Sequence, residues 1–312
     1  IDRVSGGAYE RQYIVLKVLG SDGLLTRMEQ FDTDRDAEAL ARFDELTAKQ
    51  SAPRVAAPTS RAAAQRARQV QANAATANVV RFDAAMAAQD ADALSTLFAA
   101  EYETVEHALG VTYDRQGALF SLRSLWSAEA PASRHELLAT LGDSLALCRW
   151  SRSASGFAGG TFDVGPFEGE QIALIEVDAQ GARVCTEAFA ADRLGDAVAR
   201  LYERYAELLP DGPARARAAA TARSVAALWQ RLDVDRLATA IAPAVEFVDR
   251  CTFGIVGSMR GAEALLGWLR SLGEVAVDPA SRIDDILSLR SDALLVAWAI
   301  SGTDRAGGGT FA

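Results

Sequence analysis

Histidines and cysteines are scarce in this chain of 312 residues. It has two histidines, His107 and His135, and three cysteines, Cys148, Cys185 and Cys251. No C-x-x-C or H-x-x-x-H spacing occurs, which excludes the usual structural zinc sites. The cysteines are odd in number, far apart and set in apolar runs, so we expect reduced, buried thiols. We expect no metal and no cofactor.

Positive charge and long apolar runs are also limited. The chain has 32 Lys and Arg against 42 Asp and Glu, a formal net charge of −10. Nucleic acids and anionic membranes bind basic surfaces, so neither is an expected partner. No run approaches the roughly 20 apolar residues of a membrane-spanning helix, and no signal peptide is visible. We therefore expect a cytoplasmic protein. The chain opens on Ile1 rather than Met, from which we expect a missing upstream part.

Internal repeats organise the sequence. Residues 7–45 align without a gap with residues 165–203, at an offset of 158. Residues 90–106 correspond to residues 233–249 at an offset of 143. Further along, the segment Leu122–Leu125 recurs as Leu269–Leu272, and Trp150 recurs as Trp298. The chain therefore contains more than one copy of a single domain.

The two ends carry complementary halves of that domain. We predict a C-terminal half at 1–49, a linker at 50–72, a complete copy at 73–212 and an N-terminal half at 213–312. Unpartnered strands expose backbone N–H and C=O groups, so we expect 1–49 to complete 213–312. Completion within the chain gives a pseudo-dimer with the middle copy, and completion between chains gives a domain-swapped homodimer. The arrangement is that of a fragment cut from a longer tandem array.

The complete copy predicts two helices, a strand, a third helix, four further strands and a last helix. Apolar residues at helical spacing predict a helix over 73–88, and Asp90 is a candidate N-cap for the short helix through Phe98. The remaining predicted elements are a strand at 102–108, a helix at 115–128, strands at 134–141, 144–155, 166–178 and 182–190, and a helix from Asp192 to about Leu208. Hairpin turns are expected at Asp178–Gly181 and Gly20–Gly23.

This element order resembles the nuclear transport factor two-like, or SnoaL-like, superfamily. The residues that carry the resemblance are DADALSTLFAAEYETVEHALG, the glycine hairpins and the F-x-x-DR-x-x-x-A entry to the last helix. The resemblance covers the chain outside the linker. It implies an α+β fold, a cone-shaped curved antiparallel sheet with packed helices, present here in tandem copies. The same fold serves enzymes, ligand binders and association modules, so function depends on the site.

Polar residues that face into the cone are the candidate site. Within VEHALG, His107 stands where the ketosteroid isomerase branch has its catalytic aspartate, and the resemblance implies a general base there. Strand alternation places Glu103 on the face of His107 and Glu106 on the other face. We take both as candidate catalytic carboxylates, together with Asp163 near the next strand turn.

Four further residues are expected to contact a small hydrophobic ligand: Tyr113, Trp126, Trp150 and Glu168. The counterpart of His107 in the last copy is Arg250, which cannot act as a base. The two copies are therefore not expected to share one reaction. His135, at a strand start, is interpreted as solvated.

Three functions remain open from the sequence. The first is a tandem small-molecule-binding or association module, as a fragment of a larger bacterial regulatory protein. The second is a cofactor-independent acid–base enzyme (isomerase, dehydratase, cyclase or hydrolase) acting on a small hydrophobic substrate in the middle copy. The third is a scaffold that only mediates oligomerisation. An enclosed pocket of convergent polar residues favours the enzyme, and a collapsed or wholly apolar cone favours binding or assembly.

Overall fold

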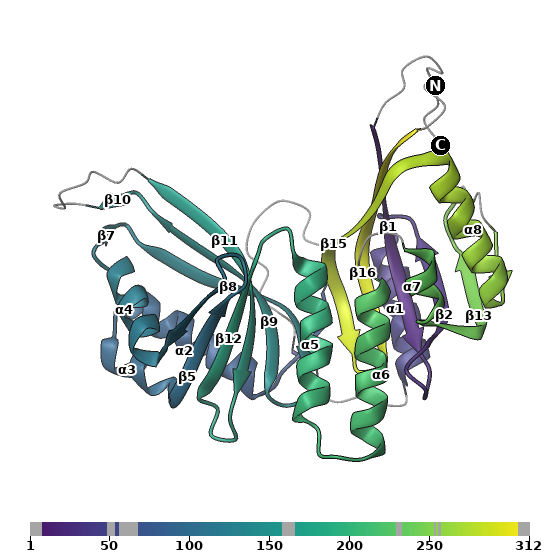
Figure 1. Ribbon diagram of the computed structural model, residues 1–312. Helices are drawn as coiled ribbons and strands as arrows, with labels where there is room; N and C mark the ends of the chain where they lie inside the picture. Colours follow the sequence, from purple (N-terminus) through teal and green to yellow (C-terminus); the bar gives the residue numbers. More distant parts are fainter. Residues whose placement is uncertain are drawn as a thin grey trace. The chain divides into compact units, whose positions relative to one another are not determined.

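Two compact units make up the protein. The computed structural model describes residues 8–48, 54–55, 68–157, 166–228, 233–252, 254 and 257–304 (Figure 1). Unit 1 lies within residues 1–52, 58–69 and 198–312, and unit 2 within residues 53–57 and 70–197. The predicted linker 50–72 is described only at 54–55 and 68–72.

Unit 2 is built on a six-stranded sheet with the order β6-β5-β12-β11-β9-β8. All neighbours are antiparallel except β5 and β12, which are parallel. The strands are β5 (Phe98–Glu106), β6 (Val111–Asp114), β8 (Ala132–Leu141), β9 (Leu145–Ala154), β11 (Phe167–Val177) and β12 (Arg183–Ala190). Two short pairs accompany the sheet: β3 (Arg54–Val55) with β4 (Val70–Gln71), and β7 (Ala128–Glu129) with β10 (Gly156–Phe157).

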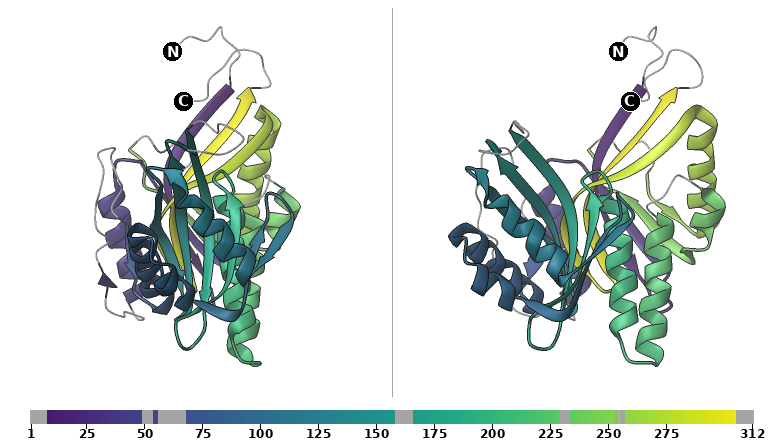
Figure 2. Two further views of the ribbon diagram at one scale, coloured as in Figure 1. Left: turned by 90° about the vertical axis from the view of Figure 1, so that its left-hand side faces the viewer. Right: turned by 60° about the vertical axis from the view of Figure 1, so that its left-hand side comes forward.

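Three helices gather on one face of the unit 2 sheet, as the views of Figure 2 show. They are α2 (Ala74–Ala88), α3 (Ala91–Thr96) and α4 (Arg115–Leu125). Phe82 of α2 and Leu122 of α4 pack with Cys148 and Ala173 of the sheet in one buried core. Because burial of each large apolar side chain contributes roughly 1.5–3 kcal/mol, this core holds the helices against that face.

Unit 1 repeats the same architecture with its chain order permuted. Its sheet has the order β14-β13-β2-β1-β16-β15, and β13 with β2 is its parallel pair. The strands are β1 (Ala8–Leu19), β2 (Leu25–Phe31), β13 (Ile241–Asp249), β14 (Met259–Arg260), β15 (Ala276–Arg290) and β16 (Ala293–Asp304). Position by position, this matches the unit 2 sheet. The protein therefore contains two copies of one α+β fold.

The first and last segments of the chain form the unit 1 sheet together. Strand β1 pairs with β16 from Ala8 opposite Thr303 to Val18 opposite Ala293. The helices of unit 1 are α1 (Asp36–Thr47), α6 (Pro213–Leu228), α7 (Val234–Ala238) and α8 (Ala262–Val275). Helix α5 (Leu194–Leu208) belongs to it in part, because the division between the units falls within this helix. Helix α1 buries Phe43 against the β-strand residues around it, and α8 packs against β13 and β15.

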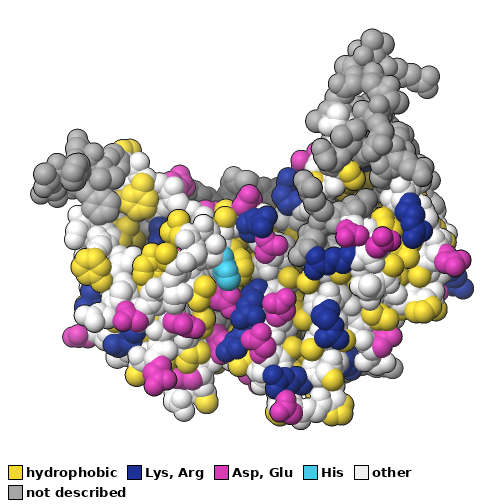
Figure 3. Space-filling view, in the orientation of Figure 1, with side chains coloured by type: hydrophobic (Ala, Val, Ile, Leu, Met, Phe, Trp, Pro, Cys, Tyr) yellow, Lys and Arg dark blue, Asp and Glu magenta, His cyan; other side chains and the backbone are white. Residues whose placement is uncertain are grey.

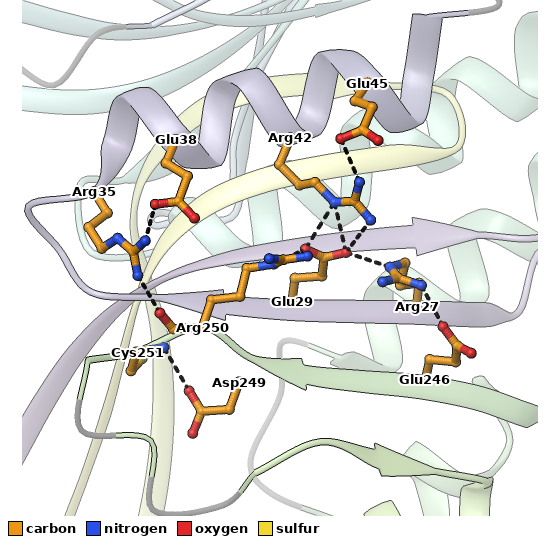
Figure 4. A network of polar contacts seen from close by, with 10 residues as sticks. All are labelled: Arg27, Glu29, Arg35, Glu38, Arg42, Glu45, Glu246, Asp249, Arg250 and Cys251. Atoms are coloured by element: carbon orange, nitrogen blue, oxygen red, sulfur yellow. Dashed lines mark hydrogen bonds and ion pairs between the residues drawn. The ribbon is translucent and has the colours of Figure 1, made fainter.

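A buried glutamate adds charged contacts between the two segments of unit 1 (Figure 4). Glu29 on β2 is fully buried, and its carboxylate accepts hydrogen bonds from Arg27 at 2.5 Å, Arg250 at 2.5 Å and Arg42 at 3.1 Å. Arg27 also pairs with Glu246 of β13 at 2.5 Å. Burial alone would raise the pKa of Glu29, but the three guanidinium hydrogen bonds hold it below its ordinary value.

Two kinds of local sequence signal are confirmed, an N-cap aspartate and the hairpin glycines. Asp90 caps α3, where its carboxylate accepts from the backbone N–H groups of the second and third residues after it, and Asp233 caps α7 in the same way. Gly23 and Gly181 close the two predicted hairpins with φ of 78° and 76°. Such a left-handed conformation favours glycine because it has no Cβ.

On the face drawn in Figure 3, basic and acidic side chains are interspersed and do not form a patch of one sign. Among the described helices, none has the length and apolar character needed to cross a bilayer. Within the same residues, no group of three His, Cys, Asp or Glu side chains could hold a metal ion.

Candidate ligand site in unit 2

Strand β5 determines which polar groups face the helices of unit 2. Tyr102, Thr104 and Glu106 line a cavity there, while Glu103 and His107 alternate to the other face of the sheet. His107 lies 40% exposed, with its Nε2 at 2.8 Å from a carboxylate oxygen of Glu187. Its counterpart in unit 1, Arg250, also pairs with a glutamate, so the two copies use this position alike.

The cavity itself is small, at about 60 Å³. Its apolar walls include Phe82, Phe98 and Trp150. Its polar lining consists of Tyr102, Thr104, Glu106, Tyr113, Ser121, Arg152, Arg183 and Thr186. Because one water needs roughly 10–15 Å³ by this kind of measure, the space holds a few waters or a group of similar size. It is a partly open hollow with both polar and apolar side chains in its lining, and it is too small for a large substrate.

Arg183 is the most deeply buried charge in this lining, at 3% exposure. Its Nε donates to Oδ1 of Asn78 at 2.6 Å. The amide nitrogen of Asn78 in turn donates to the carbonyls of Leu97 and Gly181, at 3.1 and 2.9 Å, which fixes the amide's orientation. The guanidinium also stacks over Phe82, 4.1 Å from the ring centroid. The side chain is thereby held rigidly at the cavity.

One nitrogen of the Arg183 guanidinium makes no hydrogen bond to the described residues. Among the described residues, Nη2 of Arg183 has no hydrogen-bond partner, although it is fully buried. Within the same part of the chain, no carboxylate lies at ion-pair distance from Arg183. Burial lowers the pKa of Arg183, because the charged form loses its hydration. An unpaired buried charge is costly, so this end is suited to an acceptor that enters the cavity.

The second arginine of the cavity is already engaged. Arg152 Nη2 donates to Oε1 of Gln171 at 2.5 Å, and Gln171 Nε2 donates to Oε2 of Glu106 at 2.9 Å. The Arg152 guanidinium also lies over Trp150, 4.2 Å from the ring centroid. Arg152 and Glu106 are thus joined through one amide, with their charges opposed.

A buried pair of side chains, His135 and Asp83, lies beside the cavity. His135 Nδ1 lies 2.6 Å from Asp83 Oδ1, and the backbone N–H of His135 donates to Oδ2 at 3.0 Å. The ring stacks on Trp150 at 5.3 Å. The expectation that His135 is solvated was wrong, because its side chain is only 1% exposed. Burial lowers the pKa of His135, so its imidazole is neutral, with the Nδ1 proton facing the carboxylate.

The residues predicted from the sequence divide around this cavity. Those that line it are Glu106, Tyr113 and Trp150. Those that do not line it are His107, Glu103, Trp126 and Glu168. Glu103 and Glu168 are exposed, and Trp126 packs against the edge of the core. Asp163 lies outside the described residues. Catalytic roles for these side chains stay predictions.

The corresponding interior of unit 1 carries apolar residues. Equivalent strand positions hold Leu25 for Arg183, Val245 for Tyr102, Phe247 for Thr104, Met28 for Thr186 and Ile283 for His135, all buried. Trp268 of α8 stands where α4 has Ser121, and its ring lies 5.7 Å from that of Phe247. Arg183 was not among the residues predicted from the sequence, yet the repeat contained the signal, since an arginine replaces a leucine there.

Comparison with known proteins adds likeness of fold only. No protein-family model and no curated protein sequence matches the chain. A ketosteroid isomerase-like protein from Catenulispora acidiphila, solved with trimethylamine, is 19% identical over 37% of this chain and 86% of its own, with a TM-score of 0.29. The putative polyketide cyclase IdmH from Streptomyces antibioticus is 15% identical over 38% and 92%, with a TM-score of 0.32.

A protein from Mycobacterium tuberculosis, solved with estradiol-17beta-hemisuccinate, is similar at 11% identity over 38% of this chain and 94% of its own, with a TM-score of 0.32. Each match spans a stretch of the length of one copy. The tandem architecture itself is established by the two identical strand orders.

Proposed function

We propose that this chain is a tandem small-molecule-binding module in which unit 2 holds the ligand. Unit 1 is a second copy whose interior is filled. Copies that share a fold and differ in their interiors suit sensing and assembly, so the proposal includes a place in a larger bacterial regulatory protein of the cytoplasm. Because fold alone does not decide function, the unit 2 cavity is the feature that supports ligand binding.

The observation that supports the proposal is the contrast at one position of the two copies. In unit 2, Arg183 occupies the cone with a buried polar end that lacks a partner among the described residues. In unit 1, Leu25 occupies the same position at 1% exposure. A buried cation destabilises a fold unless something pairs with it, so a structural role alone would be served better by leucine.

Ligand-observed NMR with a fragment library tests the proposal. The matched control is Ser121→Trp, which places at the mouth of the cavity the residue that unit 1 has as Trp268. Ser121 is exposed, so the indole is expected to block the cavity while the core stays intact. We expect fragments that bind the wild type and are lost in the variant. If no fragment binds, or all bind both proteins equally, the proposal is wrong.

A second candidate function is favoured by the Asp83–His135 pair. A neutral imidazole oriented by a carboxylate is the arrangement of a general base. The candidate reaction class is the predicted one, an isomerase, dehydratase, cyclase or hydrolase acting on a small hydrophobic substrate. Deuterium uptake next to the carbonyl of a bound fragment, lost in His135→Gln and kept in His107→Gln, would support it. The reverse result would favour the base predicted from the sequence.

A further inference from the structure

We infer that unit 2 selects a small monocarboxylate with a short apolar tail, and that the carboxylate pairs with Arg183 inside the cone. The inference rests on the proposed function and names its ligand class. Three features carry it: the free end of the guanidinium, the balance of charge in the cavity, and an adjoining hollow that is partly lined by Leu122, Leu125 and Phe167.

The guanidinium of Arg183 presents a single direction to a ligand. Asn78 occupies Nε, and the face of the group lies on Phe82. The two Nη nitrogens therefore remain for an acceptor. Nη2 is buried and has no hydrogen-bond partner among the described residues, and Arg183 is one of the residues that line the cavity. A carboxylate there forms a charge-assisted hydrogen bond, which is about twice as strong as a neutral one.

The charges around the cavity favour an anion with one charge. Glu106 is opposed by Arg152 through Gln171, so the carboxylate in the lining already has its counter-charge. Asp83 attracts Arg183 from beyond ion-pair range, and both its oxygens are taken by His135. Among the described residues, Arg183 is thus a cation of this lining that has no carboxylate at ion-pair distance. A monocarboxylate matches this charge, whereas a dianion would exceed it.

An apolar tail has a place beside the carboxylate. A second hollow of about 180 Å³ is lined by Leu122, Leu125, Phe167, Ser121, Ser124 and Arg152. It shares Ser121, Leu122 and Arg152 with the inner cavity, so the two spaces adjoin. The inner space of about 60 Å³ fits a carboxylate, and the outer one fits a chain of a few carbons.

Titration calorimetry with three compounds of equal length tests the inference: hexanoate, 1-hexanol and hexylammonium. We expect the wild type to bind hexanoate tighter than 1-hexanol by about tenfold or more, the value of one hydrogen bond to a charged group. Hexylammonium is expected to bind least. This comparison needs no variant, so it does not depend on how a substitution affects folding.

Two variants assign the effect to the site. Arg183→Leu installs the residue of unit 1 and removes a buried charge, so a folded protein is expected, checked by circular dichroism. It should lower hexanoate affinity far more than 1-hexanol affinity, and so remove the preference for hexanoate. Ser121→Trp should abolish binding of both compounds.

The outcomes separate the inference from the proposed function. If the wild type binds 1-hexanol as tightly as hexanoate, and Ser121→Trp blocks both, the carboxylate assignment is wrong and the binding module stands. If Arg183→Leu keeps the preference for hexanoate, Arg183 is not the recognising group. If no fragment and none of the three compounds binds in a manner sensitive to Ser121→Trp, both proposals fall.

Discussion

Lys17 carries a buried amine, and we expect this burial to lower the stability of unit 1. It lies on β1 at 2% exposure, with its Nζ 5.4 Å from the centroid of the Trp298 ring. Burial lowers the pKa of Lys17 from 10.5 to about 7, because the ammonium loses its hydration. Unit 2 has Ile175, fully buried, at the same position of its sheet. Replacing Lys17 by isoleucine thus copies a solution that the chain already contains.

The size and sign of the effect follow from proton linkage. The folded state releases its proton near pH 7 and the unfolded state near pH 10.5, so the unfolded state binds more protons between these values. The free energy of unfolding therefore rises with pH across this window. At pH 7 the penalty is ~4 kcal/mol. The cation–π contact of Lys17 with Trp298 is one interaction that offsets part of this penalty, so Lys17→Ile should stabilise unit 1 by less than ~4 kcal/mol at pH 7.

Urea unfolding followed by circular dichroism at several pH values checks this prediction. We expect Lys17→Ile to raise the midpoint at about pH 7 and to gain progressively less over wild type towards pH 9 and above. The mirror variant Ile175→Lys should destabilise unit 2 by a comparable amount at about pH 7. If Lys17→Ile is no more stable than wild type at neutral pH, and its stability changes with pH as before, the reasoning is refuted.

Three further predictions follow from other buried groups. Glu29→Gln should destabilise unit 1 by ~3–5 kcal/mol in urea unfolding, because three arginines lose their shared anion. In the wild type this contribution to stability is present at pH values above the ordinary pKa of glutamate, and it is lost as pH falls through the lowered pKa of Glu29. Gly23→Ala should lower the melting temperature clearly more than Gly181→Ala. Both positions have positive φ, but a Cβ at Gly23 would come within 2.5 Å of a backbone nitrogen of α6, whereas the nearest atom at Gly181 is a flexible arginine end at 3.3 Å. Equal melting temperatures would contradict this. His135 should remain neutral below the ordinary histidine range in an NMR titration, with His107→Gln used to assign the signals, and its contribution to stability should be lost as pH falls. A titration at or above the ordinary range would contradict this.

Local and repeated patterns were predictable from the sequence alone. The N-cap Asp90 and the hairpin glycines act within a few residues of themselves, so their chemistry is visible in the sequence. The repeat at offsets of 158 and 143 identified the tandem copies without reference to any contact. The alternation of β5 separated Glu106 from His107 because side chains of a strand point to opposite faces.

What only the tertiary structure decided is which of those faces is enclosed and which side chains meet there. Alternation assigns two sets of residues to two faces, but the position of α2, α3 and α4 makes the face of Glu106 the lining and leaves His107 outside. The site joins Asn78 of α2 with Arg183 of β12, residues 105 positions apart in the chain. No local pattern connects them, since burial of a charge and the loss of its partners arise only when distant segments pack together.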